Sequence, residues 1–251
     1  MTPSDHAARQ RRFYDTRRHD HLQAIEGDAY AHNLAEHLAR GAGIEKHHRV
    51  LEVGAGFGRF TFDLLEFCDS ITALDLSSVA LDTLERTRDE RGIPRERCRV
   101  HCADADAVTP DALGGEFDFV VGFFLLHHLE DMARTLGTLR TVLAAGGRMA
   151  FVEPNRRNPL FLAQVACCPD MTWREEKGMF RLSARGVNAV FRELGLRPLD
   201  SEPFGFFPPQ IVNLAPGFAL EKRLERIGLL KPILPMLLLS AEAPQRDTVA
   251  P

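Results

Sequence analysis

The sequence predicts an α/β fold with a doubly wound parallel sheet over about residues 45 to 153. Three observations predict it: short apolar runs alternate with helical stretches, glycines stand between them, and 251 residues suffice for such a domain. Strands that are apolar throughout are buried on both faces, which requires helices on both sides of the sheet. Right-handed crossovers then bring the carboxyl ends of the parallel strands to one edge, where ligands bind.

The predicted elements of this region follow in chain order. An amphipathic helix comes first, with apolar residues at helical spacing from Ala31 to Ala39. Apolar runs then predict five strands, at 49–53, 70–76, 98–103, 117–124 and 148–153. Helices are expected after the first, second and fourth runs, with Ser77 or Ser78 as the cap of the second. Gly146-Gly147 predicts a turn before the fifth strand.

The rhythm changes beyond Glu153, where residues 154–182 contain three prolines and show no clean period. A helix capped by Ser183 follows, then a strand at 197–203, a helix at 219–227 and a last strand at 236–241. We therefore divide the chain into an N-terminal helical cap or lid at 1–44 and a main domain at 45–251 that carries an insertion at 154–182.

Composition limits the classes of partner. The net charge of −4 gives no general attraction for nucleic acid, so we expect none as a partner. The sequence shows neither a membrane-spanning run nor an apolar signal core, and its five cysteines are odd in number, so we expect a cytoplasmic chain with reduced thiols and no membrane partner. Arginine is much commoner than lysine, which favours a bacterial source. Monomer and homodimer remain open.

A glycine-rich turn follows the first predicted strand. Gly54, Ala55, Gly56 and Gly58 lie where the strand passes into a helical stretch, and glycine permits positive φ and a close approach of a ligand to the backbone. The spacing is G-x-G-x-G rather than the dinucleotide pattern G-x-G-x-x-G, and Arg59 stands where the third dinucleotide glycine would fall. NAD and FAD are therefore disfavoured. A tight turn without a ligand is the alternative.

Three acids are expected at the same edge of the sheet. Asp75 ends the second strand and could accept hydrogen bonds from ribose hydroxyls, or else cap the following helix. Asp104 follows the third strand and could accept from an adenine amino group, or else be an ordinary loop acid. Glu52, inside the end of the first strand, would offer negative charge to a nearby ammonium or sulfonium.

The segment Glu52 to Gly58, followed by Asp75, Asp104 and the strand region 117–129, resembles the class I S-adenosylmethionine-dependent methyltransferases. The resemblance implies a Rossmann-like seven-stranded sheet whose last strand is antiparallel. It also implies S-adenosyl-L-methionine as cofactor and S-adenosyl-L-homocysteine as product, with the glycine loop on the methionine moiety, Asp75 on the ribose and Asp104 on the adenine. The residues expected to bind the cofactor are Glu52, Gly54, Ala55, Gly56, Gly58, Asp75, Leu76, Asp104, Ala105, Phe123 and, from a lid over the cofactor, Tyr14.

Methyl transfer needs a base only when the acceptor must lose a proton. His127 and His128 follow the fourth strand on the ligand-binding edge, and Glu153 ends the fifth, so each is a candidate catalytic residue. The alternatives are that the histidines pack or order the loop and that Glu153 orders the loop before Pro154. The histidines of the N-terminal region fit no metal-ligand spacing, so we expect no metal.

The predicted function is methyl transfer from S-adenosylmethionine to a small molecule, as O-methylation of a secondary metabolite. The signature Asn/Asp-Pro-Pro-aromatic of nucleic-acid amino methylases is absent after the fourth strand, where Gly122-Phe123-Phe124-Leu125 stands instead. An N- or C-methyltransferase, a cofactor-binding enzyme that does not methylate, such as a cyclase, and a regulatory subunit are the alternatives.

Overall fold

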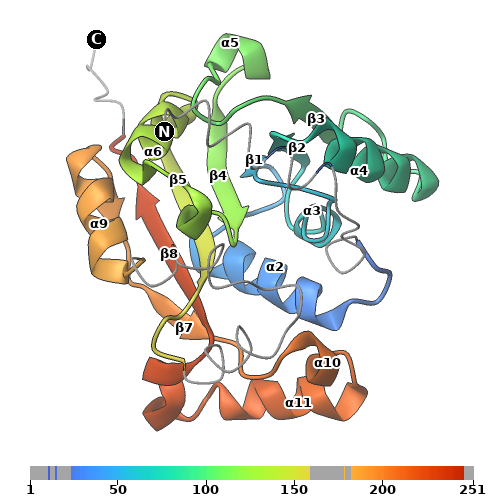
Figure 1. The fold of residues 1–251 in the computed structure, drawn as a ribbon, viewed down its shortest axis with the longest axis vertical. Helices are drawn as coiled ribbons and strands as arrows, with labels where there is room; N and C mark the ends of the chain where they lie inside the picture. The colour runs from blue at the N-terminus through green and yellow to red at the C-terminus, as the bar shows by residue number, and fades with distance from the viewer. Residues whose placement is uncertain (1–10, 12–14, 16–23, 159–177, 179–181, 246–251) are drawn as a thin grey trace.

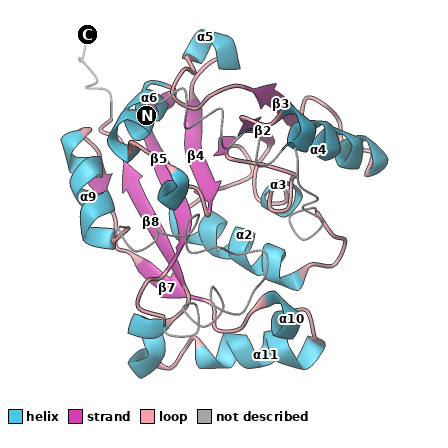
Figure 2. Ribbon diagram, in the orientation of Figure 1, coloured by secondary structure: helices cyan, strands magenta, loops and turns pink. Residues whose placement is uncertain are grey.

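The computed structural model describes residues 11, 15, 24–158, 178 and 182–245 (Figure 1). One eight-stranded sheet runs through this part of the chain, with helices on both of its faces (Figure 2). The strands are β1 (Arg49–Val53), β2 (Ser70–Asp75), β3 (Cys98–Cys102), β4 (Phe117–Phe123), β5 (Leu143–Pro154), β6 (Arg197–Pro198), β7 (Glu202–Phe204) and β8 (Met236–Glu242). Their order in the sheet is β3-β2-β1-β4-β5-β8-β6, and β7 also pairs with β8.

Strands β1 to β5 are parallel to one another, while β8 runs antiparallel to β5. The predicted doubly wound α/β fold and the antiparallel last strand are therefore confirmed. The expected number of seven strands is corrected, because the predicted strand 197–203 divides into β6 and β7, which both pair with β8. Pro198 and Pro203 lack the N–H group that a continuous ladder requires, which accounts for the short strands.

The helical elements match most of the predicted ones. They are α2 (Ala29–Ala42), α3 (Thr61–Leu64), α4 (Ser78–Glu90), α5 (Pro110–Leu113), η2 (Leu126–His128), α6 (Met132–Thr141), α9 (Ala184–Glu193), α10 (Pro209–Val212), α11 (Ala215–Leu224) and η3 (Gly228–Ile233). The hydroxyl of Ser77 accepts from the N–H of Ala80 at 3.1 Å, which confirms the expected cap of α4. The hydroxyl of Ser183 caps α9 in the same way.

Strand β5 begins earlier than the sequence predicts. Its ladder with β4 starts at Leu143, and the pairing shifts register between Phe117 and Phe119. The predicted turn at Gly146-Gly147 is therefore wrong. A Cβ on Gly147 would lie 2.8 Å from the carbonyl oxygen of Asp118, so glycine here permits close backbone approach at an irregularity inside the strand.

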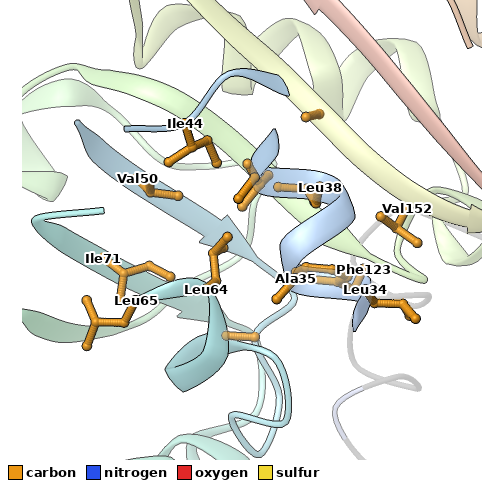
Figure 3. Close-up of a cluster of buried hydrophobic side chains, with 14 of the residues drawn as sticks. Leu34, Ala35, Leu38, Ile44, Val50, Leu64, Leu65, Ile71, Phe123 and Val152 are labelled. Atoms are coloured by element: carbon orange, nitrogen blue, oxygen red, sulfur yellow. The ribbon is translucent and has the colours of Figure 1, made fainter. Parts of the chain in front are cut away.

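Two apolar cores cover the two faces of the sheet. Along β1, Val50 packs in the core under α2, α3 and α4, whereas Leu51 packs in the core under α5, α6 and α9. Figure 3 shows Leu34 and Leu38 of α2 beside strand residues such as Val152. Helix α2, which belongs to the cap expected at 1–44, thus shares a core with the sheet.

The remaining structural expectations concern the insertion and the membrane. Most of the predicted insertion 154–182 lies outside the described residues. Over the part of the chain that the structure describes, no helix combines the length and the apolar character that crossing a membrane requires.

Candidate functional site

The glycine loop leaves β1 at the carboxyl edge of the sheet. Gly54, Gly56 and Gly58 all have positive φ, at 73°, 53° and 84°. The N–H of Gly54 donates to the carbonyl of Leu74 at 2.8 Å, which ties the loop to the neighbouring strand β2. A Cβ on Gly58 would lie 2.9 Å from Cγ of Leu84, whereas one on Gly56 would meet no atom within 4 Å. Gly58 therefore serves packing, and Gly56 borders open space that a ligand can enter.

Asp75 joins the ends of β1 and β2. One carboxylate oxygen accepts from the N–H of Gly56 at 2.8 Å, and the other accepts from the N–H of Ser77 at 2.8 Å. Burial raises the pKa of Asp75, and the backbone donors counter that effect. Each carboxylate oxygen can accept more than one hydrogen bond, so this group combines the predicted cap-like contact with the capacity to bind a diol.

Segments distant in sequence meet beside Asp75. The carbonyl of Leu76 accepts from the guanidinium of Arg11 at 3.0 Å, and the hydroxyl of Ser77 donates to Asp15. The N-terminal region thus reaches the carboxyl edge at these two residues. Tyr14, predicted to close over the cofactor, lies outside the described residues.

Asp104 and Ala105 follow β3 at the same edge. The N–H of Ala103 donates to the carbonyl of Asp75 at 3.1 Å, which places this loop next to the end of β2. The carboxylate of Asp104 is partly exposed, and one oxygen accepts from the N–H of Asp106 at 3.0 Å. Asp104 therefore makes the local turn that the alternative expects, at a position next to Asp75.

An aromatic wall closes the β4 side of the loop. Phe123 is buried and stacks on Phe60, with ring centroids 4.4 Å apart and planes 19° apart. The next residue, Phe124, has φ of 54°, and it is the only non-glycine residue with positive φ in the described part of the chain. Such a backbone conformation costs about 1–3 kcal/mol and is commonly found at functional sites. The chain therefore turns sharply at the end of β4, next to the glycine loop.

Glu52 is buried beneath the glycine loop. It is 2% exposed, and its carboxylate accepts from the hydroxyl of Thr61 at 2.6 Å. Burial raises the pKa of Glu52 to about 8, and the charge of Asp75 contributes in the same direction. At pH 7 the protonated form therefore predominates, so the negative charge expected of Glu52 is largely absent until a cation approaches.

Glu153 and His127 form a buried pair where β4 and β5 end. Nδ1 of His127 lies 2.6 Å from one carboxylate oxygen of Glu153. The other oxygen accepts from the N–H groups of Leu125 and Leu126, at 2.8 and 2.6 Å. Glu153 is 0% exposed, so its geometry fits the loop-ordering role, one of the two that the sequence left open.

The two histidines lie together on η2. The rings of His127 and His128 are 4.0 Å apart, and His128 is the more exposed of the two. Gly178, from the predicted insertion, lies so close to this turn that a Cβ on it would overlap the carbonyl oxygen of His127. The insertion therefore contacts the carboxyl edge at Gly178.

Residues that the sequence did not single out hold the glycine loop to the N-terminus of α2. Asp28, which is 6% exposed, accepts from the guanidinium of Arg59 at 3.0 Å and from the amide of Asn213 at 3.1 Å. The guanidinium of Arg59 lies over the ring of Tyr30, 5.5 Å from its centroid. Arg59 thus has a structural contact with partners far away in sequence.

The sequence predicts no metal site. In the described part of the chain, one group of possible ligands comes together: His32, Asp63 and Glu66 have ligand atoms within 4.8 Å of one another. Nδ1 of His32 lies 3.3 Å from Asp63, which an ordinary ion pair explains. The group joins the first turns of α2 to Asp63 of α3 and to Glu66 just after α3.

Known proteins share sequence with the part of the chain that forms this site. Residues 51–149 match the family model of the methyltransferase domain. The ribosomal RNA small subunit methyltransferase A of Nocardia farcinica is 32% identical over 143 residues, which cover 52% of this chain and 48% of that protein. The ubiquinone biosynthesis O-methyltransferase of Aromatoleum aromaticum is 29% identical over 117 residues, 47% of this chain and 48% of that one. The chain spans about half the length of these curated relatives.

A solved structure extends the likeness in fold. The N-methyltransferase NodS of Bradyrhizobium japonicum, in complex with S-adenosyl-L-homocysteine, superposes with a TM-score of 0.60 over 96% of this chain and 100% of that one, at 16% identity. The matched family model runs from the middle of β1 into β5 and includes the glycine loop, Asp75 and Asp104. Residues 51–149 are therefore a methyltransferase domain by their family model, and the described chain shares the fold of an S-adenosylmethionine-dependent methyltransferase.

Proposed function

We propose that this protein transfers a methyl group from S-adenosylmethionine to a small molecule, and that the acceptor is an oxygen atom of a secondary metabolite. One observation supports cofactor use most directly: the N–H of Gly56 donates to Asp75 at the carboxyl edge, beside open space. The loop and the acid are thereby held ready before any ligand binds.

The residues of the edge fit the cofactor. Gly56 leaves room for the methionine moiety against the backbone, and Asp75 can accept from the ribose hydroxyls. Asp104 directly follows Ala103, whose N–H donates to the carbonyl of Asp75, and we assign it to the adenine amino group, with Phe123 as an apolar wall. When bound, S-adenosylmethionine supplies a methyl group made electrophilic by a sulfonium. The protein's part is to bind, orient and exclude water.

We propose oxygen as the acceptor because Glu153 holds the ring of His127, the residue that we propose as the base. A proton on Nδ1 of His127 that is donated to Glu153 leaves Nε2 as the ring atom able to take a proton. His128, whose ring lies next to that of His127 at a tilt and is more exposed, is the second candidate base. Glu153 acts as a positioning residue, because it holds both the ring and two backbone N–H groups.

The experiment that tests the function follows a labelled methyl group. The protein is incubated with trideuteromethyl S-adenosylmethionine and a metabolite extract of the cell that makes it, and the products are read by mass spectrometry. A label on one small molecule names the substrate, and fragmentation shows whether oxygen, nitrogen or carbon carries it. Confirmed cofactor binding without any label in an extract that contains candidate acceptors would refute methyl transfer in favour of a cyclase-like or regulatory role.

The roles of His127, His128 and Glu153 are tested separately. His127→Ala and His128→Ala should separate the base from the packing residue, because loss of the base lowers turnover while affinity for S-adenosylhomocysteine and the melting temperature hold. Glu153→Gln keeps an oxygen acceptor but loses the charge, so it should move the pH profile of turnover rather than KM. Full turnover in both histidine variants would remove both from the role of base.

A further inference from the structure

Exposed apolar side chains gather on one segment of the chain. Among the described residues, eight large hydrophobic side chains are exposed, and six of them lie between residues 211 and 233. These six are Ile211, Leu214, Leu220, Ile227, Leu229 and Ile233. They belong to α10, α11, η3 and the residues that join them, at the end of the molecule beside β7 (Figure 1). Apolar exposure concentrated in this way marks an interaction surface.

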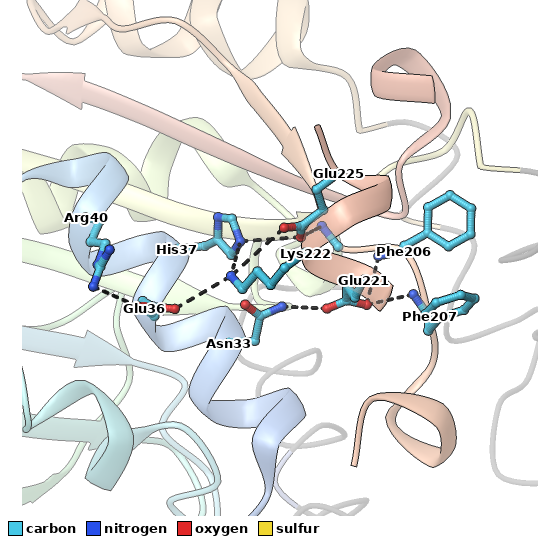
Figure 4. Close-up of polar contacts among 10 residues, drawn as sticks. Asn33, Glu36, His37, Arg40, Phe206, Phe207, Glu221, Lys222 and Glu225 are labelled. Carbon is cyan, nitrogen blue, oxygen red and sulfur yellow. Dashed lines mark hydrogen bonds and ion pairs between the residues drawn. The ribbon is translucent and has the colours of Figure 1, made fainter. Parts of the chain in front are cut away.

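In the same segment, the acidic and the basic side chains face different sides. Its two acids, Glu221 and Glu225, point toward α2, as Figure 4 shows. Glu221 accepts from Asn33 at 2.6 Å and from the N–H groups of the loop after β7, and Glu225 lies 3.4 Å from His37. Both carboxylates are therefore engaged on the inner side of α11.

The basic side chains of the segment are mostly exposed. Arg223, Arg226 and Lys231 are exposed, while Lys222 lies 3.6 Å from Glu36 on the inner side. The outer side of residues 220–233 therefore combines aliphatic and basic groups, and its acids face inward. Leu229 is 89% exposed, so its side chain projects from the surface rather than lining a groove.

We propose that this outer side, defined by Leu220, Arg223, Arg226, Ile227, Leu229, Lys231 and Ile233, docks on an anionic lipid surface. Aliphatic side chains enter the boundary between headgroups and acyl chains, and basic side chains meet the negative headgroups. A second copy of the chain is a poorer occupant, because a two-fold contact would bring the same basic residues against one another. This proposal goes beyond methyl transfer and replaces the expectation of no membrane partner.

The test measures binding of the full chain to vesicles by co-sedimentation. One set of vesicles is phosphatidylcholine, and the other contains about one-third phosphatidylglycerol. We expect binding to the anionic set alone and weaker binding as salt rises, since the Debye length is about 10 Å at 0.1 M. Arg223→Glu with Arg226→Glu should weaken binding by at least about 25-fold, at about five-fold for each lost basic group. Leu229→Ser should weaken it by roughly ten-fold.

Matched controls come from the opposite end of the sheet. Val79→Ser and Arg86→Glu change an exposed aliphatic and an exposed basic side chain of α4, and they should bind as the unaltered chain does. Equal loss in the controls, or binding that the Arg223/Arg226 and Leu229 variants leave unchanged, overturns the proposal. So does the absence of vesicle binding together with a dimer that Leu229→Ser dissociates in sedimentation velocity, since the occupant is then a second copy.

Discussion

Replacing Glu52 with glutamine should change how stability depends on pH. The side chain is 2% exposed, and burial raises its pKa to about 8 in the folded protein from an ordinary value of 4.5. Between these values the folded chain holds a proton on Glu52 that the unfolded chain has released. The contribution of this group is therefore fully present below pH 4.5 and is lost as pH rises through 8.

The size of the effect follows from the width of that window. The shift from 4.5 to about 8 spans 3.5 pH units, and at about 1.36 kcal/mol per unit it amounts to roughly 5 kcal/mol. Glutamine has nearly the shape of the protonated acid, and its oxygen can still accept from Thr61, whose hydroxyl lies 2.6 Å from Glu52. Glu52→Gln should thus match the unaltered chain near pH 4.5 and exceed it by several kcal/mol at pH 9.

Urea unfolding followed by circular dichroism at one-unit steps of pH measures this difference. The free energy of unfolding of the unaltered chain, relative to that of Glu52→Gln, should fall by about 1.4 kcal/mol for each unit between about pH 5 and pH 8 and stay level above that. Asp75, whose pKa burial also raises, remains in both proteins, so most of its effect cancels. Glu90→Gln at the exposed end of α4 is the control. Parallel curves for Glu52→Gln and the unaltered chain would refute a protonated Glu52.

Three further predictions concern the same edge. Gly58→Ala should cost about 1–3 kcal/mol of stability, because its Cβ would lie 2.9 Å from Leu84, whereas Gly56→Ala should mainly weaken cofactor binding. Chemical unfolding measures the stability of both variants, and calorimetry measures their cofactor binding. Equal losses of stability in the two variants would contradict this assignment. Asp75→Asn should weaken S-adenosylhomocysteine binding by roughly 10- to 100-fold by calorimetry, and unchanged affinity removes Asp75 from the ribose role. Asp28→Ala should cost about 2–4 kcal/mol in urea unfolding, since it leaves Arg59 without its partner; a loss within 0.5 kcal/mol, about that of a neutral surface change, would argue against this contact.

Local signals explain why most of the fold could be predicted. Strand β1 and the cap of α4 at Ser77 are determined by residues close together in the sequence, so the local pattern is enough to predict them. Strand β5 was predicted to start too late, because the glycines at 146 and 147 also signal a turn. Only the neighbouring strand decides between a turn and an irregular strand, and a local pattern carries no information about that neighbour.

The candidate site also contains contacts that a sequence pattern predicts and contacts that it does not. The glycine loop and Asp75 are joined by one hydrogen bond between residues 19 positions apart, and their spacing in the sequence is diagnostic. The contact of Arg59 with Asp28 and the link from Asp28 to Asn213, 185 positions away, have no such signature. An arginine after a glycine loop could equally well be a surface residue, so its partner is found only in the folded chain.

Cofactor binding can be inferred from the sequence more readily than the identity of the acceptor. The cofactor half of the edge is built from the ends of β1, β2 and β3, which follow one another closely in the sequence, so a short sequence pattern describes it. The proposed acceptor half combines η2 and Glu153 with Gly178 of the predicted insertion. The proposed acceptor residues come from segments distant in sequence, so a labelled product identifies the acceptor more directly than further comparison of glycine loops.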